Sequence, residues 1–384
     1  MKIALGIMFP ADLTKRAGGL KNVSANLVTG FMRRTELEVH IVDCNRDVAR
    51  DTLEAIGNVA VHRLAAPRVR VLPNLLASVC KAQREFRRIQ PDVVNAHTGH
   101  YATAALLAGI PTVYTIHGVA RQEARLYRRT WFDRLRYNLA VLYDAYATPR
   151  ADLVVAISPY VVQQYGNRVD RRWRSVDVPV ADEFFSIPDR TVPGRIFCAG
   201  TIDERKNGLG LLRALARVRE QAPEAHLHFG GRVATPEYFA RMQAFVAEQG
   251  LAEHVIFQGL LNSGQLLDAY GECAVLALTS HQETTPAVII EAAAAHKPSV
   301  AMLVGGVEEL LEDGRTGYIV PMDDEEAFAE RTVRLLRDAG LRREMGARAR
   351  AKVEERFRID RVVDRYLDVY REAIEARASK GRAR

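Results

Sequence analysis

The chain has 384 residues, of which 48% are hydrophobic, and this is enough for two domains of about 180 residues with separate cores. Apolar runs stay well short of the roughly 20 residues that cross a bilayer, and the first residues lack the apolar region of a signal peptide, so we expect a cytoplasmic protein. The four cysteines are widely spaced, which argues against a disulfide framework and against a cysteine metal site.

The net charge of +7 is unevenly distributed along the chain. Residues 1–190 contain 27 lysines and arginines against 18 acidic residues, whereas the remainder contains 27 against 29. An anionic partner is therefore expected at the first half of the chain rather than at the second.

Short apolar segments alternate with helical patterns through the first half. One helix is expected after the first strand, and two more are expected over residues 74–89 and 100–109. The expected strands are residues 2–10, 37–44, 91–97, 111–118 and 151–160. This alternation is typical of an α/β fold in which helices connect parallel strands.

Four residues of this half stand where α/β folds bind ligands. Gly18 and Gly19 precede the first helix, where they either let backbone amides approach a phosphate or form a simple turn. His97 and His117 each end a buried strand, and ligands of open α/β sheets bind beyond the carboxyl ends of the strands. Each histidine is therefore either a site residue or a buried structural one.

Residues 121–136 contain six arginines and two acids, with aromatic residues between them. The segment is either a solvated basic helix face or a site for an acceptor or an anionic membrane surface, on which the protein would be peripheral on the inner face. No nucleic-acid-binding motif accompanies the charge, so nucleic acid is not an expected partner. The candidate acceptor or membrane contacts are His97, Arg125, Arg128, Arg129 and Trp131.

A proline-rich stretch over residues 175–195 has no helical period and is predicted to join two domains. Arg205 and Lys206 lie farther on, at the entrance of a helix, where they either clamp a diphosphate or form a charged turn. The last eight residues are expected to fray as a solvated tail. The strands expected in the second half are 195–200, 226–231, 255–259, 273–280, 297–306 and 316–320.

The stretch from Ser280 to His296 carries two carboxylates on either side of a turn between a strand and an alanine-rich helix. We expect Thr285 to be the N-cap and Pro286 the first helical residue, which places Glu291 in the second turn and Glu283 on the loop. A helix N-terminus suits a phosphate, and a carboxylate can accept two hydrogen bonds from a ribose diol. The alternative is that both glutamates are solvated surface residues.

The E-x7-E spacing resembles that of retaining nucleotide-sugar glycosyltransferases of family 4 (group 1), which have the GT-B fold. This resemblance implies an α/β protein of two Rossmann-like domains whose parallel sheets face each other across a cleft. It implies that Glu283 contacts the donor sugar, that Glu291 contacts the ribose, and that His117 and Lys206 are catalytic. The further donor-binding residues implied are Gly18, Gly19, Arg205, Gln258, Gly259, Leu260, Thr284, Thr285, Gly305 and Gly306.

The chain departs from the family pattern at several positions. Thr201 replaces the usual arginine of the phosphate motif, and Arg205 is a candidate replacement. Ala181 stands in the linker where an aspartate is common. Pro286 lies where the family often has glycine, and it has no N–H to offer a ligand.

The predicted domains are residues 1–178, binding the acceptor, and 195–360, binding the donor, with a linker at 179–194 and a C-terminal helix and basic tail at 361–384. The resemblance implies transfer with retention from a nucleotide sugar, UDP- or GDP-linked, to a glycan or lipid-phosphate acceptor in cell-envelope or exopolysaccharide synthesis. It implies no cofactor and no metal, and the chain has no Asp-x-Asp motif. The alternatives are a GT-B protein that binds nucleotide or glycan without catalysis, and a nicotinamide-dependent dehydrogenase, which would need a G-x-G-x-x-G loop.

Overall fold

The computed structural model describes residues 1–12, 19–45, 48–66, 72–126 and 130–382. Their contacts divide the chain into two compact units. The first unit contains the described parts of residues 1–179 together with residues 359–382, and the second contains residues 180–358.

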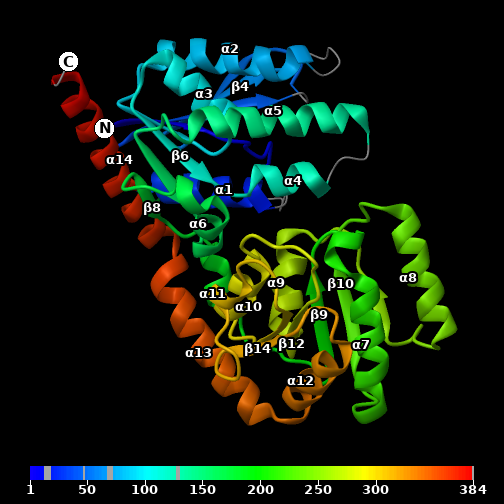
Figure 1. Ribbon diagram of the computed structural model, residues 1–384. Coiled ribbons are helices and arrows are strands. Elements are labelled where there is room, and N and C mark those ends of the chain that lie inside the picture. Colours follow the sequence, from blue (N-terminus) through cyan, green and yellow to red (C-terminus); the bar gives the residue numbers. More distant parts are fainter. Residues whose placement is uncertain (13–18, 46–47, 67–71, 127–129, 383–384) are drawn as a thin grey trace. The chain divides into compact units, whose positions relative to one another are not determined.

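The first unit is built on an eight-stranded sheet with the order β3-β4-β2-β1-β5-β6-β7-β8. Its strands β4, β6 and β8 are labelled in Figure 1. All neighbouring strands are parallel except β3 and β4, which form an antiparallel pair at one edge. The central strands are buried apolar runs, as parallel sheets covered on both faces require. The strands are β1 (Lys2–Gly6), β2 (Glu38–Asn45), β3 (Thr52–Ile56), β4 (Val59–Ala65), β5 (Val93–Ala96), β6 (Thr112–Ile116), β7 (Leu153–Ala156) and β8 (Trp173–Ser175).

Helices cover both faces of this sheet. The helices α2, α3 and α5 pack against one another in one layer, and α1 packs against α14, which also contacts β5 and β6. In α2 the amphipathic pattern decides the orientation, because Val79 and Phe86 are buried while Arg84 is exposed. The helices of this unit are α1 (Gly19–Met32), α2 (Leu72–Ile89), α3 (Gly99–Ala108), α4 (Ala120–Leu126), α5 (Trp131–Ala147), α6 (Pro159–Tyr165), the short 3-10 helix η1 (Gly166–Arg168) and α14 (Ile359–Arg382).

The second unit has a parallel six-stranded sheet with the order β11-β10-β9-β12-β13-β14. The chain starts this sheet in the middle, builds outward to β11 and then continues from β12 on the other side of β9. The strand order therefore reverses between β9 and β12, and open α/β sheets bind ligands at such a reversal. The strands are β9 (Arg195–Ala199), β10 (His226–Gly230), β11 (Val255–Phe257), β12 (Val275–Leu278), β13 (Ser299–Met302) and β14 (Gly317–Val320).

Successive residues of β9 point to opposite faces of the second sheet, and each face has its own helices. Ile196 belongs to the core that α7, α8 and α12 share, whereas Phe197 packs on Tyr270 of α9. The helices are η2 (Asp182–Ser186) and η3 (Glu204–Lys206), both 3-10, then α7 (Gly208–Gln221), α8 (Pro236–Glu248), α9 (Ser263–Glu272), α10 (Ala287–Ala294), α11 (Val307–Leu310), α12 (Glu325–Arg337) and α13 (Ala339–Phe357).

The predicted domain boundaries differ from the observed units at both ends of the second unit. Residues 179–194 were expected to link the domains, but Phe184 is buried and Arg190 N–H donates to Gly271 O at 3.1 Å, so the stretch from residue 180 onward packs on the second unit. Its proline-rich composition concealed the apolar side chains that anchor it.

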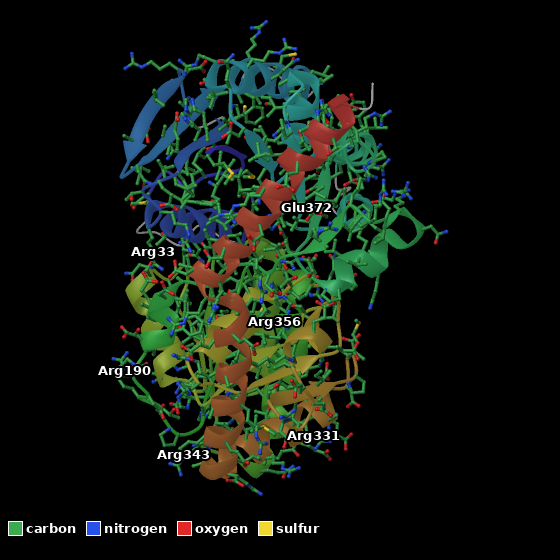
Figure 2. All side chains as sticks on the ribbon, turned by 90° about the vertical axis from the view of Figure 1, so that its left-hand side faces the viewer. Arg33, Arg190, Arg331, Arg343, Arg356 and Glu372 are labelled. Atoms are coloured by element: carbon green, nitrogen blue, oxygen red, sulfur yellow. The ribbon has the colours of Figure 1, made fainter. Side chains whose placement is uncertain are left out.

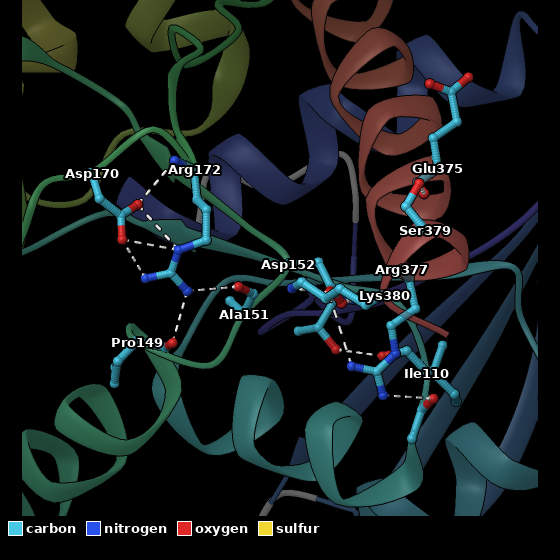
Figure 3. Close-up of polar contacts among 12 residues, drawn as sticks. Ile110, Pro149, Ala151, Asp152, Asp170, Arg172, Glu375, Arg377, Ser379 and Lys380 are labelled. Carbon is cyan, nitrogen blue, oxygen red and sulfur yellow. Dashed lines mark hydrogen bonds and ion pairs between the residues drawn. The ribbon is translucent and has the colours of Figure 1, made fainter. Parts of the chain in front are cut away.

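The prediction of a fraying C-terminal tail is wrong for the described residues, because α14 continues to Arg382. Glu372, labelled on this helix in Figure 2, forms an ion pair with Arg174 of β8. Farther along, Lys380 Nζ lies 3.0 Å from Asp152 Oδ1, and the Asp152 side chain is wholly buried (Figure 3). The basic residues that suggested a solvated tail therefore hold the helix end on the first unit.

Three strands that the sequence did not predict are present, namely β3, β4 and β8. The basic segment of residues 121–136 is divided between α4 and α5, because Thr130 and Asp133 form a capping box that starts α5. Among the described residues, no helix combines the length and the apolar character that a membrane span needs.

Candidate functional site

The candidate site lies at the carboxyl ends of β9 and β12, where the strand order of the second sheet reverses. Glycines let the backbone segments beyond these strands approach one another closely. Gly200 has φ of +147°, and a Cβ added to Gly231 would lie 1.8 Å from Gly200 O. The loop after β9 is therefore pressed against the loop after β10, and neither glycine can be replaced without moving backbone.

Lys206 is held by a series of capping interactions. Asp203 caps η3 by accepting a hydrogen bond from Lys206 N–H at 3.0 Å. Asn207 follows with φ of +51° and caps α7 through its side chain, which accepts from Gly210 N–H at 3.1 Å. Thr279, just after β12, donates from its hydroxyl to Asn207 O at 3.0 Å. These contacts fix the turn that carries Lys206 to the end of β12.

The Lys206 ammonium is paired with Glu283, the first carboxylate of the E-x7-E spacing. Nζ lies 2.5 Å from Glu283 Oε1, and Arg205 Nη1 lies 3.7 Å from the same oxygen. Glu283 is only 8% exposed, so two cations surround a largely desolvated carboxylate. The structure thus brings together three of the predicted donor-binding residues.

Arg205 is further anchored to the loop that precedes α10. Its Nη1 donates to Gln282 O at 3.1 Å, while its own carbonyl accepts from His281 N–H at 2.8 Å. Arg205 is thus joined to the loop that carries Glu283, whereas the Thr201 hydroxyl donates to Asp203 at 2.8 Å.

The glycine pair after β13 packs directly on the loop of Glu283. A Cβ on Gly305, whose φ is +53°, would lie 1.7 Å from Glu283 O, and a Cβ on Gly306 would lie 2.4 Å from Thr284 O. Side chains at these two positions would displace the loop that carries Glu283. The two predicted glycines therefore shape the site through their lack of a side chain.

Glu291 lies in the second turn of α10, as expected, but the predicted helix start is wrong. The N-cap is Pro286, with ψ of 95°, and the helix begins at Ala287. Thr285 Oγ1 makes no hydrogen bond to any described residue, so it does not cap the helix. A proline in this extended conformation ended the loop one residue later than the usual cap preference suggested.

A pocket opens beside Lys206, between the β9 and β12 ends and α7. Ser280, which is wholly buried, has a hydroxyl without a hydrogen-bond partner among the described residues, and it lines this pocket. Burial raises the pKa of the Cys198 thiol to about 12, so this side chain stays protonated. The lining residues are Cys198, Ala199, Gly200, Thr201, Ile202, Asp203, Lys206, Gly208, Phe229, Met242, Leu278, Thr279 and Ser280.

Residues 258–260, predicted to contact a nucleobase, follow β11. Gln258 and Leu260 are exposed, and Gly259 O accepts from Gly231 N–H at 2.8 Å. The loops after β9, β10 and β11 are thereby joined at one edge of the sheet.

In the first unit, the two predicted histidines form a pair. His97 Nδ1 lies 2.7 Å from His117 Nε2, and the rings are stacked with centroids 5.0 Å apart. His97 is 2% exposed. Burial lowers the pKa of His117 to about 4 and that of His97 well below its usual value, so both rings are neutral at pH 7.

The remaining predicted residues of this unit are described in part. Gly19 is the first residue of α1, and Gly18 lies outside the described residues together with Arg128 and Arg129. Arg125 lies in α4, and Trp131 begins α5 with 63% of its surface exposed.

Comparison with known proteins places these features in a family. The description "Glycosyl transferases group 1" matches residues 181–352, and "Glycosyltransferase Family 4" matches residues 17–178. A D-inositol 3-phosphate glycosyltransferase of Acidothermus cellulolyticus is 36% identical over 94% of this chain and 87% of its own length. The chain belongs to the family 4 glycosyltransferases. The dehydrogenase alternative is accordingly set aside.

A further relative of this glycosyltransferase and two solved structures were also found, and the structures agree in fold. A D-inositol 3-phosphate glycosyltransferase of Paenarthrobacter aurescens is 27% identical, with 93% of this chain and 94% of that protein covered. The solved sucrose-phosphate synthase of Thermosynechococcus elongatus has a TM-score of 0.78 at 20% identity, covering 98% and 99% of the two chains. HepE of Anabaena in complex with UDP-glucose has a TM-score of 0.73 at 18% identity, covering 96% and 98%. The expected GT-B fold class is confirmed.

The sequence did not single out several residues that shape the site of this glycosyltransferase. Asp203 carries a recognisable signal, an acidic residue three positions before the backbone N–H that it caps. Ser280 carries no such signal, and neither does Tyr270, whose hydroxyl donates to Glu291 at 2.7 Å. A serine at a strand end and an aromatic residue in an amphipathic helix are common in any core.

Proposed function

We propose that this protein transfers a sugar from a nucleotide-sugar donor to a hydroxyl of a glycan or lipid-linked acceptor, with retention of anomeric configuration. The observation that carries the proposal is the cluster of Lys206, Arg205 and Glu283 at the reversal point of the second sheet. Cations at this position suit a diphosphate, and a carboxylate beside them suits sugar hydroxyls.

The chemistry follows from where charge develops. The bond between the anomeric carbon and the diphosphate oxygen breaks while the acceptor oxygen forms its bond to the same carbon, and the hydroxyl proton leaves with the nucleoside diphosphate. Lys206 and Arg205 stabilise the negative charge on the departing group, and Glu283 orients the sugar as positive charge grows. Because the Lys206 ammonium has three N–H donors, one can remain on Glu283 while the others reach phosphate oxygens.

His117 is proposed to contact the donor sugar. A neutral imidazole has one donor and one acceptor nitrogen. Because Nε2 of His117 is hydrogen-bonded to His97, Nδ1 of His117 is the nitrogen proposed to contact the ligand. Glu291 is proposed to accept the ribose hydroxyls. No cofactor and no metal is part of the proposed reaction.

The nucleotide is proposed to be UDP or GDP, and UDP is the first candidate because HepE binds UDP-glucose. A thermal-shift screen with UDP-, GDP- and ADP-glucose tests this proposal. We expect at least one nucleotide sugar to raise the melting temperature, since a ligand that binds only the folded state stabilises it. Absence of any shift at millimolar concentrations would contradict donor binding.

An acceptor that carries lipid phosphate is proposed for the basic first unit. Along α5 the large apolar side chains of Trp131 and Leu142 are 63% and 64% exposed, and Arg134 is exposed beside them, a combination that suits an anionic interface. Co-sedimentation with vesicles containing phosphatidylglycerol at low salt is expected, and it should weaken when Trp131 and Leu142 are both changed to serine. Equal sedimentation with neutral vesicles would contradict the electrostatic part of the proposal.

A further inference from the structure

We infer that Tyr270 is a positioning residue for nucleotide recognition, because its hydroxyl holds the Glu291 carboxylate in the orientation that accepts the ribose hydroxyls. The inference rests on the proposed function, from which it takes the ribose as the ligand of Glu291. It assigns a role to a residue of α9 that lies in the interior of the second unit.

The hydrogen bond between the two side chains is short and well placed. Tyr270 Oη donates to Glu291 Oε2 at 2.7 Å, and Glu291 is 8% exposed. A hydrogen bond from a neutral hydroxyl to a carboxylate is stronger than one between neutral groups, and burial strengthens it further. The carboxylate is therefore fixed about its terminal torsion, which is otherwise a broad one.

The Tyr270 ring is itself immobilised by aromatic packing. The rings of Tyr270 and Phe197 of β9 pack edge to face, with centroids 5.2 Å apart and an interplanar angle of 85°. Phe184 of η2 makes a similar contact at 5.4 Å and 80°. Tyr270 has no exposed surface, so its hydroxyl cannot turn to solvent. Because Phe197 belongs to β9, this packing fixes the Tyr270 hydroxyl, and through it the Glu291 carboxylate, relative to that strand.

A second contact ties the same hydroxyl to the start of α10. Tyr270 Oη lies 3.5 Å from Val288 O, in the first turn of the helix that carries Glu291 one turn later. The hydroxyl has a single proton, which it donates to Glu291, so the longer contact with Val288 O places the hydroxyl beside the first turn without a second full hydrogen bond. This arrangement keeps Glu291 aligned with the helix N-terminus, where a nucleotide phosphate would be bound.

The physical expectation is a loss of preorganisation when the hydroxyl is removed. In Tyr270→Phe the ring and its two aromatic contacts remain, but Glu291 loses the hydrogen bond that Tyr270 donates to it. The free energy of binding a ribose would then include the cost of ordering the Glu291 carboxylate. The preference for ribose over deoxyribose should therefore fall. Folding should be affected less than recognition, because the volume of the side chain is nearly unchanged.

The test compares ribose discrimination in the wild type and in Tyr270→Phe. Calorimetric titration with UDP and 2′-deoxy-UDP, or with GDP and 2′-deoxy-GDP if the guanine nucleotide binds better, gives the ratio of the two dissociation constants. We expect the wild type to prefer the ribonucleotide about 10-fold or more, as a lost hydrogen bond to a charged group requires, and the ratio to approach one in Tyr270→Phe.

Two controls separate positioning from a general structural role. Tyr238→Phe removes another buried tyrosine hydroxyl of the second unit, one that accepts from Leu209 N–H at 3.0 Å, and it should keep the wild-type ratio. In a Glu291→Gln background, Tyr270→Phe should change nucleotide affinity less than twofold further, because residues that act through one contact are not additive.

The outcomes distinguish the inference from the function beneath it. A wild type that discriminates and a Tyr270→Phe variant that discriminates equally would overturn the inference alone. A wild type that binds both nucleotides equally would overturn the ribose role of Glu291 and the inference with it. A wild type that binds no nucleotide would refute the proposed function itself.

Discussion

Lys206 and Glu283 depend on each other because each is the main charge partner of the other in a desolvated position. Their side chains are 17% and 9% exposed, and their charged atoms lie 2.5 Å apart. Removing one partner leaves a buried charge, which usually costs more than removing both. The pair therefore links the stability of the site to its function.

This coupling predicts a particular pattern in a double-mutant cycle. Lys206→Met should lower the free energy of unfolding by about 1–3 kcal/mol, and adding Glu283→Gln should recover part of that loss. Urea unfolding followed by circular dichroism measures both. If the double variant instead loses the sum of the two single losses, Lys206 and Glu283 are not coupled, and Arg205 alone neutralises Glu283.

Glu291 makes a separate prediction about binding. Glu291→Gln keeps the shape of the side chain but removes the charge that both Tyr270 and a ribose would donate to. Nucleotide affinity should fall about 10-fold while the melting temperature changes little. Calorimetry with UDP or GDP provides the comparison, and an unchanged dissociation constant would argue against the ribose role.

At this scale the sequence predicted side chains with distinctive chemistry and missed those whose role is packing. Glu283 and Lys206 stand out because charged residues next to buried strands require partners, and the structure places them together. Thr285 illustrates the opposite case. Cap preferences favour threonine, but the backbone angles at Pro286 put the helix start one residue later, and no local pattern reveals this.

At the scale of elements, α14 shows how the end of the chain completes the first unit. Tyr366 and Tyr370 of this helix are buried, and the Tyr370 hydroxyl accepts from Asn95 Nδ2 at 2.7 Å on the strand that leads to His97. The last turns are held by Asp152, which also accepts from Thr112 N–H at 3.0 Å. The helix therefore supports the strands β5 and β6, which carry the histidine pair.

Truncation before Arg377 tests this support. Loss of residues 377–384 removes both cations beside Asp152, with Nη1 of Arg377 at 3.8 Å and Nζ of Lys380 at 3.0 Å (Figure 3). The wholly buried carboxylate is then unpaired, and stability should fall by about 1–3 kcal/mol. In the truncated protein, Asp152→Asn should restore part of the lost free energy of unfolding, measured by chemical denaturation. If the truncated protein is equally destabilised with asparagine at this position, the loss comes from other contacts of the helix.

Strong patterns at this scale were predictable and weak ones were not. The buried parallel strands stand out as apolar runs, and α2 stands out by its helical period. The edge strand β3 was missed because its residues are mostly exposed and its sequence, TLEAI, lacks an apolar run, and β4 was missed because His62 and Arg63 interrupt its apolar residues. The C-terminal turns were missed because their basic residues pair with Asp152, a contact across more than 200 positions of sequence.

At the scale of the whole molecule, buried neutral histidines make stability depend on pH. The pKa of His117 is lowered to about 4 by burial, against about 6.5 in an unfolded chain. Between these values the unfolded state binds more protons, so the stability that this group contributes is complete above pH 6.5 and declines as pH falls towards 4. Asp43, whose burial raises the pKa to about 6, opposes this trend in the same unit.

The histidine contribution is isolated by comparing the wild type with His117→Gln, whose amide can still meet His97. The difference in unfolding free energy between the two proteins should fall by about 1–3 kcal/mol from pH 7 to pH 4. Hydrogen exchange of amides in β5 and β6 reports on this unit specifically. A difference that is constant with pH would mean that His117 has the same pKa in the folded protein as in the unfolded chain.

Lys206 and Glu283 are proposed to act on a nucleotide-sugar donor during transfer, and the most direct test is the rate of donor cleavage. Once the donor screen has identified the nucleotide sugar, release of the nucleoside diphosphate is measured at saturating donor for the wild type, Lys206→Ala and Glu283→Gln. Each variant should remain folded by circular dichroism and lose roughly 100-fold or more in turnover, the scale expected when a transition-state contact is removed. Wild-type turnover in either folded variant would contradict the account.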